Sequence, residues 1–370
     1  MRILLVFRAP VGGLFRHVRD LARGLHERGH EVGILCDSEG GGEVARRLLA
    51  DSAAHCQLGI VRKPISRMPG VGDLAGVRHT LKMARAIRAD IIHGHGAKGG
   101  LYARLAGRRL GVPSLYTPHG GSLYYDWSTT AGKAFLATEW ALARLVDAQS
   151  FVCTFERDRF LELLGHPRSR NIVAYNGLWP EEFERLVPEP GAADVVLMGD
   201  MRPVKGVDIL LDALAILKPD GPVSANIVGD GPQMADFQAQ ASRLGLDEQV
   251  RFLGRLPARD ALQKGRLLVM PSRNESFPYT VLEALSTEVP IITSRVGGIA
   301  EALPEHMMLA RLDAPTLAAK IRERLASASH TRAESVSLRE MARKRFSAAK
   351  MTGDILAFYN RLLTEAGRSG

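Results

Sequence analysis

The sequence has little cysteine and no long apolar run, and both absences narrow the class of protein. Three of its 370 residues are cysteine, at the well-separated positions 36, 56 and 153. Their spacing fits neither a zinc site nor a disulfide framework, which favours a reducing compartment. No apolar stretch approaches the roughly 18 residues of a membrane span, and the five-residue run between Arg2 and Arg8 is too short for a signal peptide. The sequence therefore predicts a soluble, cytoplasmic protein.

Aromatic residues are also scarce, at 6% of the chain, whereas basic residues are concentrated in the first half. Residues 1–180 carry 25 Lys and Arg against 15 Asp and Glu, and residues 181–370 carry 24 against 25. The basic segment has no interleaved aromatics and no helix-turn-helix or RNA-recognition signature, so nucleic acid is not an expected partner. Two interpretations stay open: a solvated, Arg-rich surface, or a face that meets anionic lipid at the inner side of the cell membrane.

Short β-branched runs alternate with amphipathic helical patterns along nearly the whole chain. Strands are expected near residues 2–7, 31–36, 91–95, 114–117, 150–154, 194–199, 224–229, 250–254, 266–272 and 290–294. Helices are expected at residues 15–29, 77–89, 207–217 and 232–245, at the segment that starts near Pro278, and at the C-terminus. This alternation predicts parallel sheets with right-handed crossovers. The fold class is therefore α/β, with two Rossmann-like, doubly wound domains facing each other across a cleft.

A proline-interrupted stretch, residues 176–193, marks the expected hinge between the domains. We predict an N-terminal domain over residues 1–176, a C-terminal domain over 177–350, and a final helix over 351–370 that either stays with the second domain or packs back on the first. Ligands of open α/β sheets bind beyond the carboxyl ends of the strands, which directs attention to the loops there.

Two loops of the first half are candidates for ligand binding. Gly12 and Gly13 follow the first strand and open a helix, where backbone N–H groups can approach an anion. The loop is not a G-x-G-x-x-G fingerprint, so it is either an anion cradle or a plain tight turn. His119 follows the strand at 114–117 and precedes two glycines. Its place at a strand end favours a role in the site over that of a surface histidine.

In the second half, Arg202 and Lys205 lie between a strand and a helix in "MGDMRPVKGVDILLDAL". Cations beside a helix N-terminus are unfavourable to the helix dipole. The position of these two cations is explained if they bind an anion together with the backbone amides of the helix N-terminus. A solvated basic turn is the weaker interpretation.

In the stretch "SRNESFPYTVLEALSTEVPIITSRVGG", the glutamates at positions 275 and 283 lie eight residues apart. Pro278 suits the first turn of a helix, which places Glu275 just before that helix and Glu283 about two turns inside it. Compensation of the helix dipole explains Glu275 better than Glu283, which lies among apolar residues and needs a partner. Vicinal hydroxyls of a sugar or ribose would serve as that partner. Gly297 and Gly298 then open a further helical turn with amides suited to phosphate. Together these loops predict a nucleotide-sugar site.

These motifs resemble the retaining, GT-B-fold glycosyltransferases of family four along nearly the whole chain, of the bacterial polysaccharide or lipopolysaccharide type. "NESFPYTVLEAL" resembles the family's E-x7-E motif, and "GDMRPVKG", "IVGDGP", "VRFLGRL" and "RVGGIAE" follow the family's order. "YNGL", "IIHGHGAKGGLYARL" and "YTPHGG" match its first half. The chain departs from the usual pattern where Arg202 stands two places later than the frequent Arg, where Ser276 replaces a frequent Gly, and where Ala300 replaces a frequent Pro.

The resemblance implies a role for each candidate residue. Lys205 and Arg202 would neutralise the donor diphosphate, Glu283 would accept from the ribose, and Glu275 would hold hydroxyls of the donor sugar and stabilise the charge at its ring. The neighbourhoods of Phe277, Gly298 and Ile299 would complete the phosphate and sugar cradle. His119 would reach the sugar near the reacting carbon, and Gly12 and Gly13 would approach the diphosphate from the first domain.

The implied reaction is a metal-independent, retaining transfer of a hexose type of sugar with no cofactor. No Asp-x-Asp occurs in the sequence, so lysine and arginine would supply the positive charge that a metal supplies elsewhere. The expected acceptor is a glycan or a lipid-linked glycan. Tyr124, Tyr125, Trp127 and Trp140 either pack a helix or form an acceptor wall or membrane edge. Two alternative functions stay open. A nucleotide-sugar epimerase has the same two-domain architecture, and a non-catalytic two-lobed binding protein has a similar shape.

Overall fold

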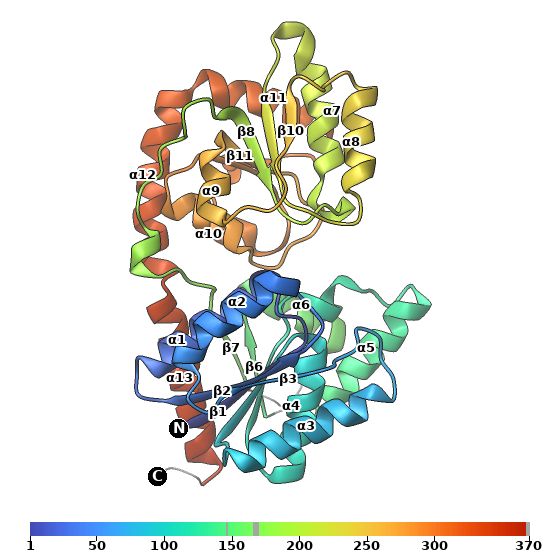
Figure 1. Cartoon of the computed structure of the whole chain (residues 1–370), viewed down its shortest axis with the longest axis vertical. Helices are drawn as coiled ribbons and strands as arrows, with labels where there is room; N and C mark the ends of the chain where they lie inside the picture. Colours follow the sequence, from blue (N-terminus) through green and yellow to red (C-terminus); the bar gives the residue numbers. More distant parts are fainter. Residues whose placement is uncertain (146, 166–169, 368–370) are drawn as a thin grey trace. The chain divides into compact units, whose positions relative to one another are not determined.

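The structure, a computed structural model, describes residues 1–145, 147–165 and 170–367. The chain forms two compact units (Figure 1). Unit 1 comprises Met1–Asn176 together with Ala348–Gly370, and unit 2 comprises Gly177–Ser347. Each is a parallel α/β layer structure, as the alternating pattern predicts. Among the described residues, no helix has both the length and the apolar character needed to cross a membrane.

Unit 1 is built on a seven-stranded parallel sheet in the order β3-β2-β1-β4-β5-β6-β7. The strands are β1 (Arg2–Phe7), β2 (Glu31–Asp37), β3 (Ile60–Lys63), β4 (Ile91–His95), β5 (Ser114–Thr117), β6 (Ala148–Phe151) and β7 (Arg170–Val173). The interior strand β1 pairs with β2 on one side and β4 on the other. The strand order reverses at this point, which is where the carboxyl-end loops of such sheets diverge and bind ligands.

Helices cover both faces of this sheet. They are α1 (Gly12–His26), α2 (Gly42–Ser52), α3 (Gly72–Ala86), α4 (Gly96–Leu110), α5 (Thr130–Leu142), α6 (Thr154–Leu164) and α13 (Ala348–Glu365). The alternating side chains of β1 determine the two cores. Ile3, Leu5 and Phe7 pack with α1 and α13, and Leu4 and Val6 pack with α3 and α4.

The last helix completes the core of unit 1 after 171 residues of unit 2 have intervened. Figure 1 shows α13, in red, beside α1. Gly24 permits the close approach, because a Cβ at that position would lie 2.2 Å from Thr352 Oγ1. Tyr359 of α13 also reaches the sheet, where its hydroxyl lies 2.7 Å from Nδ1 of His93 in β4. The helix therefore helps to fix the strand that carries His95.

Unit 2 is a six-stranded parallel sheet in the order β10-β9-β8-β11-β12-β13. Its strands are β8 (Ala193–Met198), β9 (Ala225–Val228), β10 (Val250–Phe252), β11 (Gly265–Met270), β12 (Ile291–Ser294) and β13 (Met308–Leu309). Its helices are α7 (Val207–Leu217), α8 (Met234–Arg243), α9 (Ala258–Gln263), α10 (Tyr279–Ser286), α11 (Ala314–Ala326) and α12 (Ala328–Arg345). Here the strand order reverses between β8 and β11, so the loops after these two strands are the ligand-binding candidates.

The expected strands are present, with local differences that have physical reasons. The strand expected at residues 150–154 ends at Phe151, because the Cys153 Sγ accepts from the Glu156 N–H and caps α6. The sequence pattern missed β3 and β7 at the two edges of the unit 1 sheet and β13 at one edge of the unit 2 sheet. All three are short edge strands, which give a weak sequence signal. The final helix begins at Ala348, three residues before the expected position.

Candidate active site

Three loops of unit 2 meet at the carboxyl ends of the neighbouring strands β8, β11 and β12. The loop after β8 holds Arg202 and Lys205, and the loop after β11 holds Glu275. The loop after β12 leads into the 3-10 turn Gly297–Glu301. The structure therefore brings together residues from three separate motifs, at the position that sheet topology favours for a ligand.

Lys205 and Glu275 form the central contact of this group. Lys205 Nζ lies 2.6 Å from Glu275 Oε1, and Ser272 Oγ donates to the same oxygen at 3.0 Å. The lysine side chain is 26% exposed and the glutamate side chain 11%. Lys205 thus has a carboxylate partner, which compensates for a cation placed just before α7. Both groups stay partly open to solvent, so an incoming anion can reach the lysine.

Arg273 braces the two loops from the outside. Its Nη1 and Nη2 donate to the two carboxylate oxygens of Asp208 at 2.8 and 2.6 Å, a bidentate pair at the start of α7. Its backbone N–H donates to Val204 O at 2.7 Å. Partial burial raises the pKa of Asp208, but the Arg273 hydrogen bonds and charge outweigh it and hold the pKa below its usual range. Lys205 and Glu275 are therefore presented by braced loops.

Glu283 corrects one of the sequence expectations. Helix α10 begins at Tyr279 with Pro278 as its N-cap, and it ends at Ser286. Glu283 is thus the fifth residue of an eight-residue helix, about one turn inside it, where the sequence analysis expected two. Its side chain is half-buried among Val281, Leu282 and Ala284, which are buried.

The Gly-Gly turn lies directly against the loop of Glu275. Gly297 has a φ of 59°, and a Cβ there would lie 2.0 Å from Glu275 O, so a side chain at this position would displace that loop. Gly298 N–H donates to Ser276 O at 2.7 Å and Ile299 N–H to Val296 O at 3.4 Å. These two amides therefore have protein acceptors, whereas the sequence analysis expected them to face a phosphate. Phe277 is buried, and its ring packs on Phe346.

Arg202 lies in the same loop as Lys205 but is exposed. Its backbone shapes the turn, since its carbonyl accepts from Lys205 N–H at 3.0 Å. The arginine is therefore placed on the surface of the loop, and the lysine is placed against Glu275.

In unit 1, Gly12 and Gly13 open α1 after β1, and both are exposed. His119 follows β5 and adopts a φ of 55°, a left-handed backbone that is uncommon for histidine. Glu156, a buried residue at the start of α6, holds this turn because its carboxylate accepts from the N–H groups of Gly120 and Val152. Backbone strain at a fixed loop residue is typical of functional sites.

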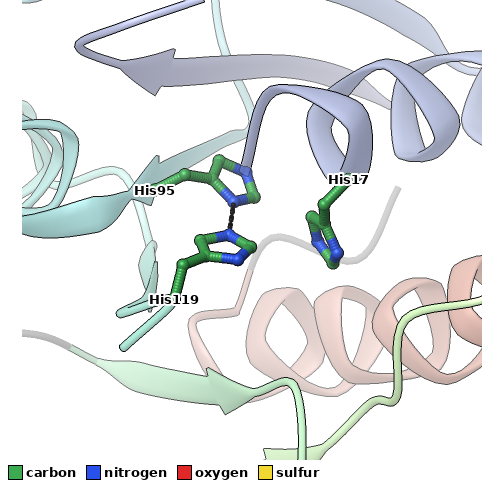
Figure 2. A group of neighbouring side chains, drawn as sticks. All are labelled: His17, His95 and His119. Carbon is green, nitrogen blue, oxygen red and sulfur yellow. Dashed lines mark hydrogen bonds between the residues drawn. The ribbon is translucent and has the colours of Figure 1, made fainter. Parts of the chain in front are cut away.

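Two neighbours of His119 were not predicted from the sequence. Figure 2 shows His17 of α1 and His95 at the end of β4 facing it. Nδ1 of His95 lies 3.1 Å from Nε2 of His119, and the rings of His17 and His119 are 4.7 Å apart between centroids. Burial lowers the pKa of His17 to about 4 and the pKa values of His95 and His119 well below their usual range. All three imidazoles are therefore neutral near pH 7.

Four aromatic residues between β5 and β6 are exposed, as an acceptor wall or membrane edge requires. Tyr124, Tyr125, Trp127 and Trp140 are each between 36 and 45% exposed. Trp127 and Trp140 line a surface hollow of about 460 Å³ together with Arg144 and Leu163. The hollow combines apolar faces with one cation, a surface chemistry that suits sugar rings and lipid headgroups alike.

The sequence matches two profiles of one glycosyltransferase family, one on each half. The profile described as Glycosyltransferase Family 4 matches residues 11–182, and that described as Glycosyl transferases group 1 matches residues 192–327. The structure of the Anabaena protein HepE in complex with UDP and glucose superposes with a TM-score of 0.82, at 20% identity, over 97% of this chain and 99% of that one. This similarity shows that the chain has the GT-B fold.

Curated relatives agree with this assignment. One component of the human phosphatidylinositol N-acetylglucosaminyltransferase is 25% identical over 320 residues, 82% of this chain and 63% of the relative. The glycogen synthase of Mycobacterium tuberculosis is 27% identical over 333 residues, 82% of this chain and 80% of the relative. The chain therefore spans less than two thirds of the human protein. With both halves matched in order, the chain belongs to the family 4, or group 1, glycosyltransferases, whose members are retaining and metal-independent.

Proposed function

We propose that this chain transfers a sugar from a nucleoside-diphosphate donor, with retention of configuration, to a glycan or lipid-linked glycan acceptor in cell-surface polysaccharide or lipopolysaccharide synthesis. The observation that carries the proposal is the Lys205–Glu275 pair at the strand ends of unit 2. It joins a cation suited to phosphate and a carboxylate suited to sugar hydroxyls. The complexes of HepE with UDP and with UDP-glucose support a nucleotide sugar as the donor and make uracil the first base to test.

In this proposal the diphosphate replaces Glu275 as the partner of Lys205. Departure of the nucleoside diphosphate leaves negative charge on its phosphate and positive character on the sugar ring. Lys205 stabilises the first charge, with Arg202 as a second cation, and the released Glu275 carboxylate stabilises the second. Because Arg273 links the loops that carry both side chains, little backbone reorganisation accompanies the development of charge.

The other site residues take positioning roles. Glu283 accepts from the ribose hydroxyls. Phe277, with Gly298 and Ile299, shapes the wall beside the donor sugar, since the amides of the last two already have protein acceptors. In unit 1, His119 hydrogen-bonds the donor sugar near the reacting carbon, and the backbone of Gly12 and Gly13 approaches the diphosphate at the start of α1.

The proposal is tested by the thermal stability of the chain with UDP, GDP, ADP and their sugar conjugates, with EDTA present. A ligand at about 100 times its dissociation constant stabilises the folded chain by roughly 2.7 kcal/mol. We expect a shift with one nucleotide family that is lost in Lys205→Ala and Glu283→Ala. Lys264→Ala is the matched control, because Lys264 is 28% exposed and pairs with Glu189 at 2.7 Å elsewhere in unit 2. Equal loss in the control, or no shift with any nucleotide, refutes the donor site.

The reaction itself separates transfer from epimerisation. Incubation of the donor without acceptor leaves its sugar unchanged if the chain is a transferase, whereas an epimerase converts it. Binding without either reaction, across a panel of glycan and lipid-linked acceptors, would favour a two-lobed binding protein.

The basic unit 1 provides a surface for the proposed membrane contact. A groove of about 1010 Å³ lies between β3 and α3, with Val71 and Leu74 strongly exposed at its edge. Its lining includes the cations Lys63, Arg78 and Lys82. Apolar side chains ringed by cations suit the headgroup region of an anionic bilayer.

Co-sedimentation with vesicles tests this contact. Binding to phosphatidylglycerol vesicles is expected to weaken with salt and to fall in Lys82→Glu. Arg251→Glu, which makes the same charge change at an exposed position of unit 2, is expected to bind as the unmodified chain does. Vesicle binding that does not depend on lipid charge or on salt would refute an electrostatic contribution to the membrane contact.

A further inference from the structure

The three histidines of unit 1 form a cluster that the proposed transfer does not fully use. His17, His95 and His119 come from α1, β4 and the loop after β5, and each offers one ligand atom within 4.8 Å of the others (Figure 2). The reaction described above needs the ring of His119 alone. The other two are buried in the ligand-free chain and call for a physical explanation.

A ring nitrogen of the cluster lacks a hydrogen-bond partner. Nε2 of His17 is buried without a partner among the residues that the structure describes. A buried polar atom left in this way destabilises the fold unless a ligand pairs with it. His17 Nδ1 lies 2.9 Å from Asn176 Oδ1, which can only accept, so the proton sits on Nδ1 and the Nε2 lone pair is free. A histidine that ligates a metal has the same arrangement, with its second nitrogen donating to an oxygen.

We propose that His17, His95 and His119 bind a divalent transition-metal ion, of which Zn²⁺ is the representative. Imidazole nitrogen is a preferred ligand of Zn²⁺, and three protein ligands leave a fourth position open. With bonds of about 2.0–2.1 Å, ligand nitrogens around a tetrahedral ion lie roughly 3.3 Å apart. The 3.1 Å between His95 Nδ1 and His119 Nε2 already matches this spacing. Small side-chain rotations bring in the third nitrogen.

The exposure of the three side chains indicates how such an ion would enter the site. His119 is half-buried, whereas the other two are enclosed, so the ion would enter from the His119 side. That side is also the one from which His119 would reach the donor sugar. The ion is therefore an inhibitor and not a cofactor, a consequence that rests on the proposed function, whereas metal binding itself does not.

The metal site is tested on the full chain by competition with a chromophoric zinc chelator and by the visible absorption of bound Co²⁺. We expect one ion per chain and the strong Co²⁺ absorption of a four-coordinate site. His17→Gln removes a ligand and is expected to weaken binding more than 100-fold. Asn176→Ala removes only the outer partner of His17, and its expected loss is about 10–100-fold.

His55→Gln is the matched control. His26 and His55 form a second, partly exposed histidine pair with ring centroids 5.4 Å apart, which could bind metal adventitiously. Affinity that survives His17→Gln but falls in His55→Gln, or the absence of tight binding in the unmodified chain, overturns the proposal. If circular dichroism shows that His17→Gln does not fold, His119→Gln replaces it, because His119 lies in a loop.

The inhibition has its own readout. Stoichiometric Zn²⁺ is expected to lower the rate of sugar transfer by the unmodified chain. The same fractional loss in His17→Gln should need a Zn²⁺ concentration more than 100-fold higher. Each rate is compared with the metal-free rate of the same variant. Sugar transfer that continues at saturating Zn²⁺ would refute the inhibition but not the metal site. A chain that binds one ion at the cluster but transfers sugar from no donor would refute the proposed function, and again not the metal site.

Discussion

His93 lies in the middle of β4 and His119 in the loop after the adjacent strand β5, and we expect opposite consequences from replacing them. His93 is fully buried, and its two ring nitrogens lie 2.7 Å from Tyr359 Oη and 2.8 Å from Thr117 Oγ1. His93→Leu leaves both hydroxyls buried without that partner, at about 1–3 kcal/mol each. The expected loss in the free energy of unfolding is therefore roughly 2–6 kcal/mol.

His119→Asn should change stability little. The substitution removes the contact with His95, a neutral hydrogen bond worth about 0.5–1.5 kcal/mol. Asparagine tolerates the left-handed backbone at a φ of 55° better than histidine, which offsets part of that loss. The net change should stay below about 1.5 kcal/mol. Transfer should nevertheless fall by about 100–1000-fold, the typical effect of removing one preorganised hydrogen-bonding group at a reacting centre.

Urea denaturation and initial rates of sugar transfer, measured on the same preparations, check both expectations. The reasoning fails if His119→Asn is destabilised as strongly as His93→Leu, since His119 would then be a structural residue. It also fails if His119→Asn transfers sugar within tenfold of the unmodified rate. The His93→Leu preparation serves as the control for folding, because its loss of transfer should track its loss of folded protein.

Three further predictions concern groups buried in unit 1. Glu139→Ala should lower the free energy of unfolding by about 3–5 kcal/mol, because it leaves the charge of Arg104 buried without its carboxylate partner. The Arg104 side chain is 0% exposed and lies 2.6 Å from that carboxylate. A loss below about 1 kcal/mol in urea denaturation would contradict this expectation. Burial raises the pKa values of Cys36 and Cys56 to about 12, so both thiols should react with Ellman's reagent at pH 8 only after unfolding. Labelling of the native chain as fast as that of the unfolded chain would refute this expectation. His17 titrates near 6.5 when unfolded and near 4 when folded, so the unfolded chain binds more protons between these values. Stability in EDTA should therefore fall as the pH drops through that window, by up to about 3 kcal/mol, and a pH dependence unchanged in His17→Gln would contradict this.

Sequence reasoning located the loops of the candidate site because their signals are local. Gly297 stands between a strand and a turn, and Lys205 and Glu275 follow strands that the β-branched pattern predicts. The contact between Lys205 and Glu275 spans 70 residues and depends on which strands are neighbours in the sheet. Strand order is a tertiary property, so the pair itself could not be predicted from spacing.

The histidine cluster shows the same limit more strongly. His17 is at a buried position of an amphipathic helix, where a histidine is commonly a satisfied core residue. Its hydrogen-bond partner Asn176 lies 159 residues away. One signal was available in the strand motif "IIHGH", since two histidines in a fully buried strand need partners. The depth of Glu283 in its helix was also misjudged, because Pro278 is the N-cap and α10 begins only at Tyr279.

The place of α13 in the core of unit 1 has a consequence for how the chain is made. Met351, Ile355 and Phe358 fill a core whose other members, such as Ile3 and Phe15, leave the ribosome more than 300 residues earlier. Unit 2 is an insertion in topological terms and can fold as soon as it has been synthesised, whereas unit 1 exposes an unfilled apolar face until the last helix arrives. A nascent chain stalled at Ser347 would therefore present one finished domain and one that attracts chaperones.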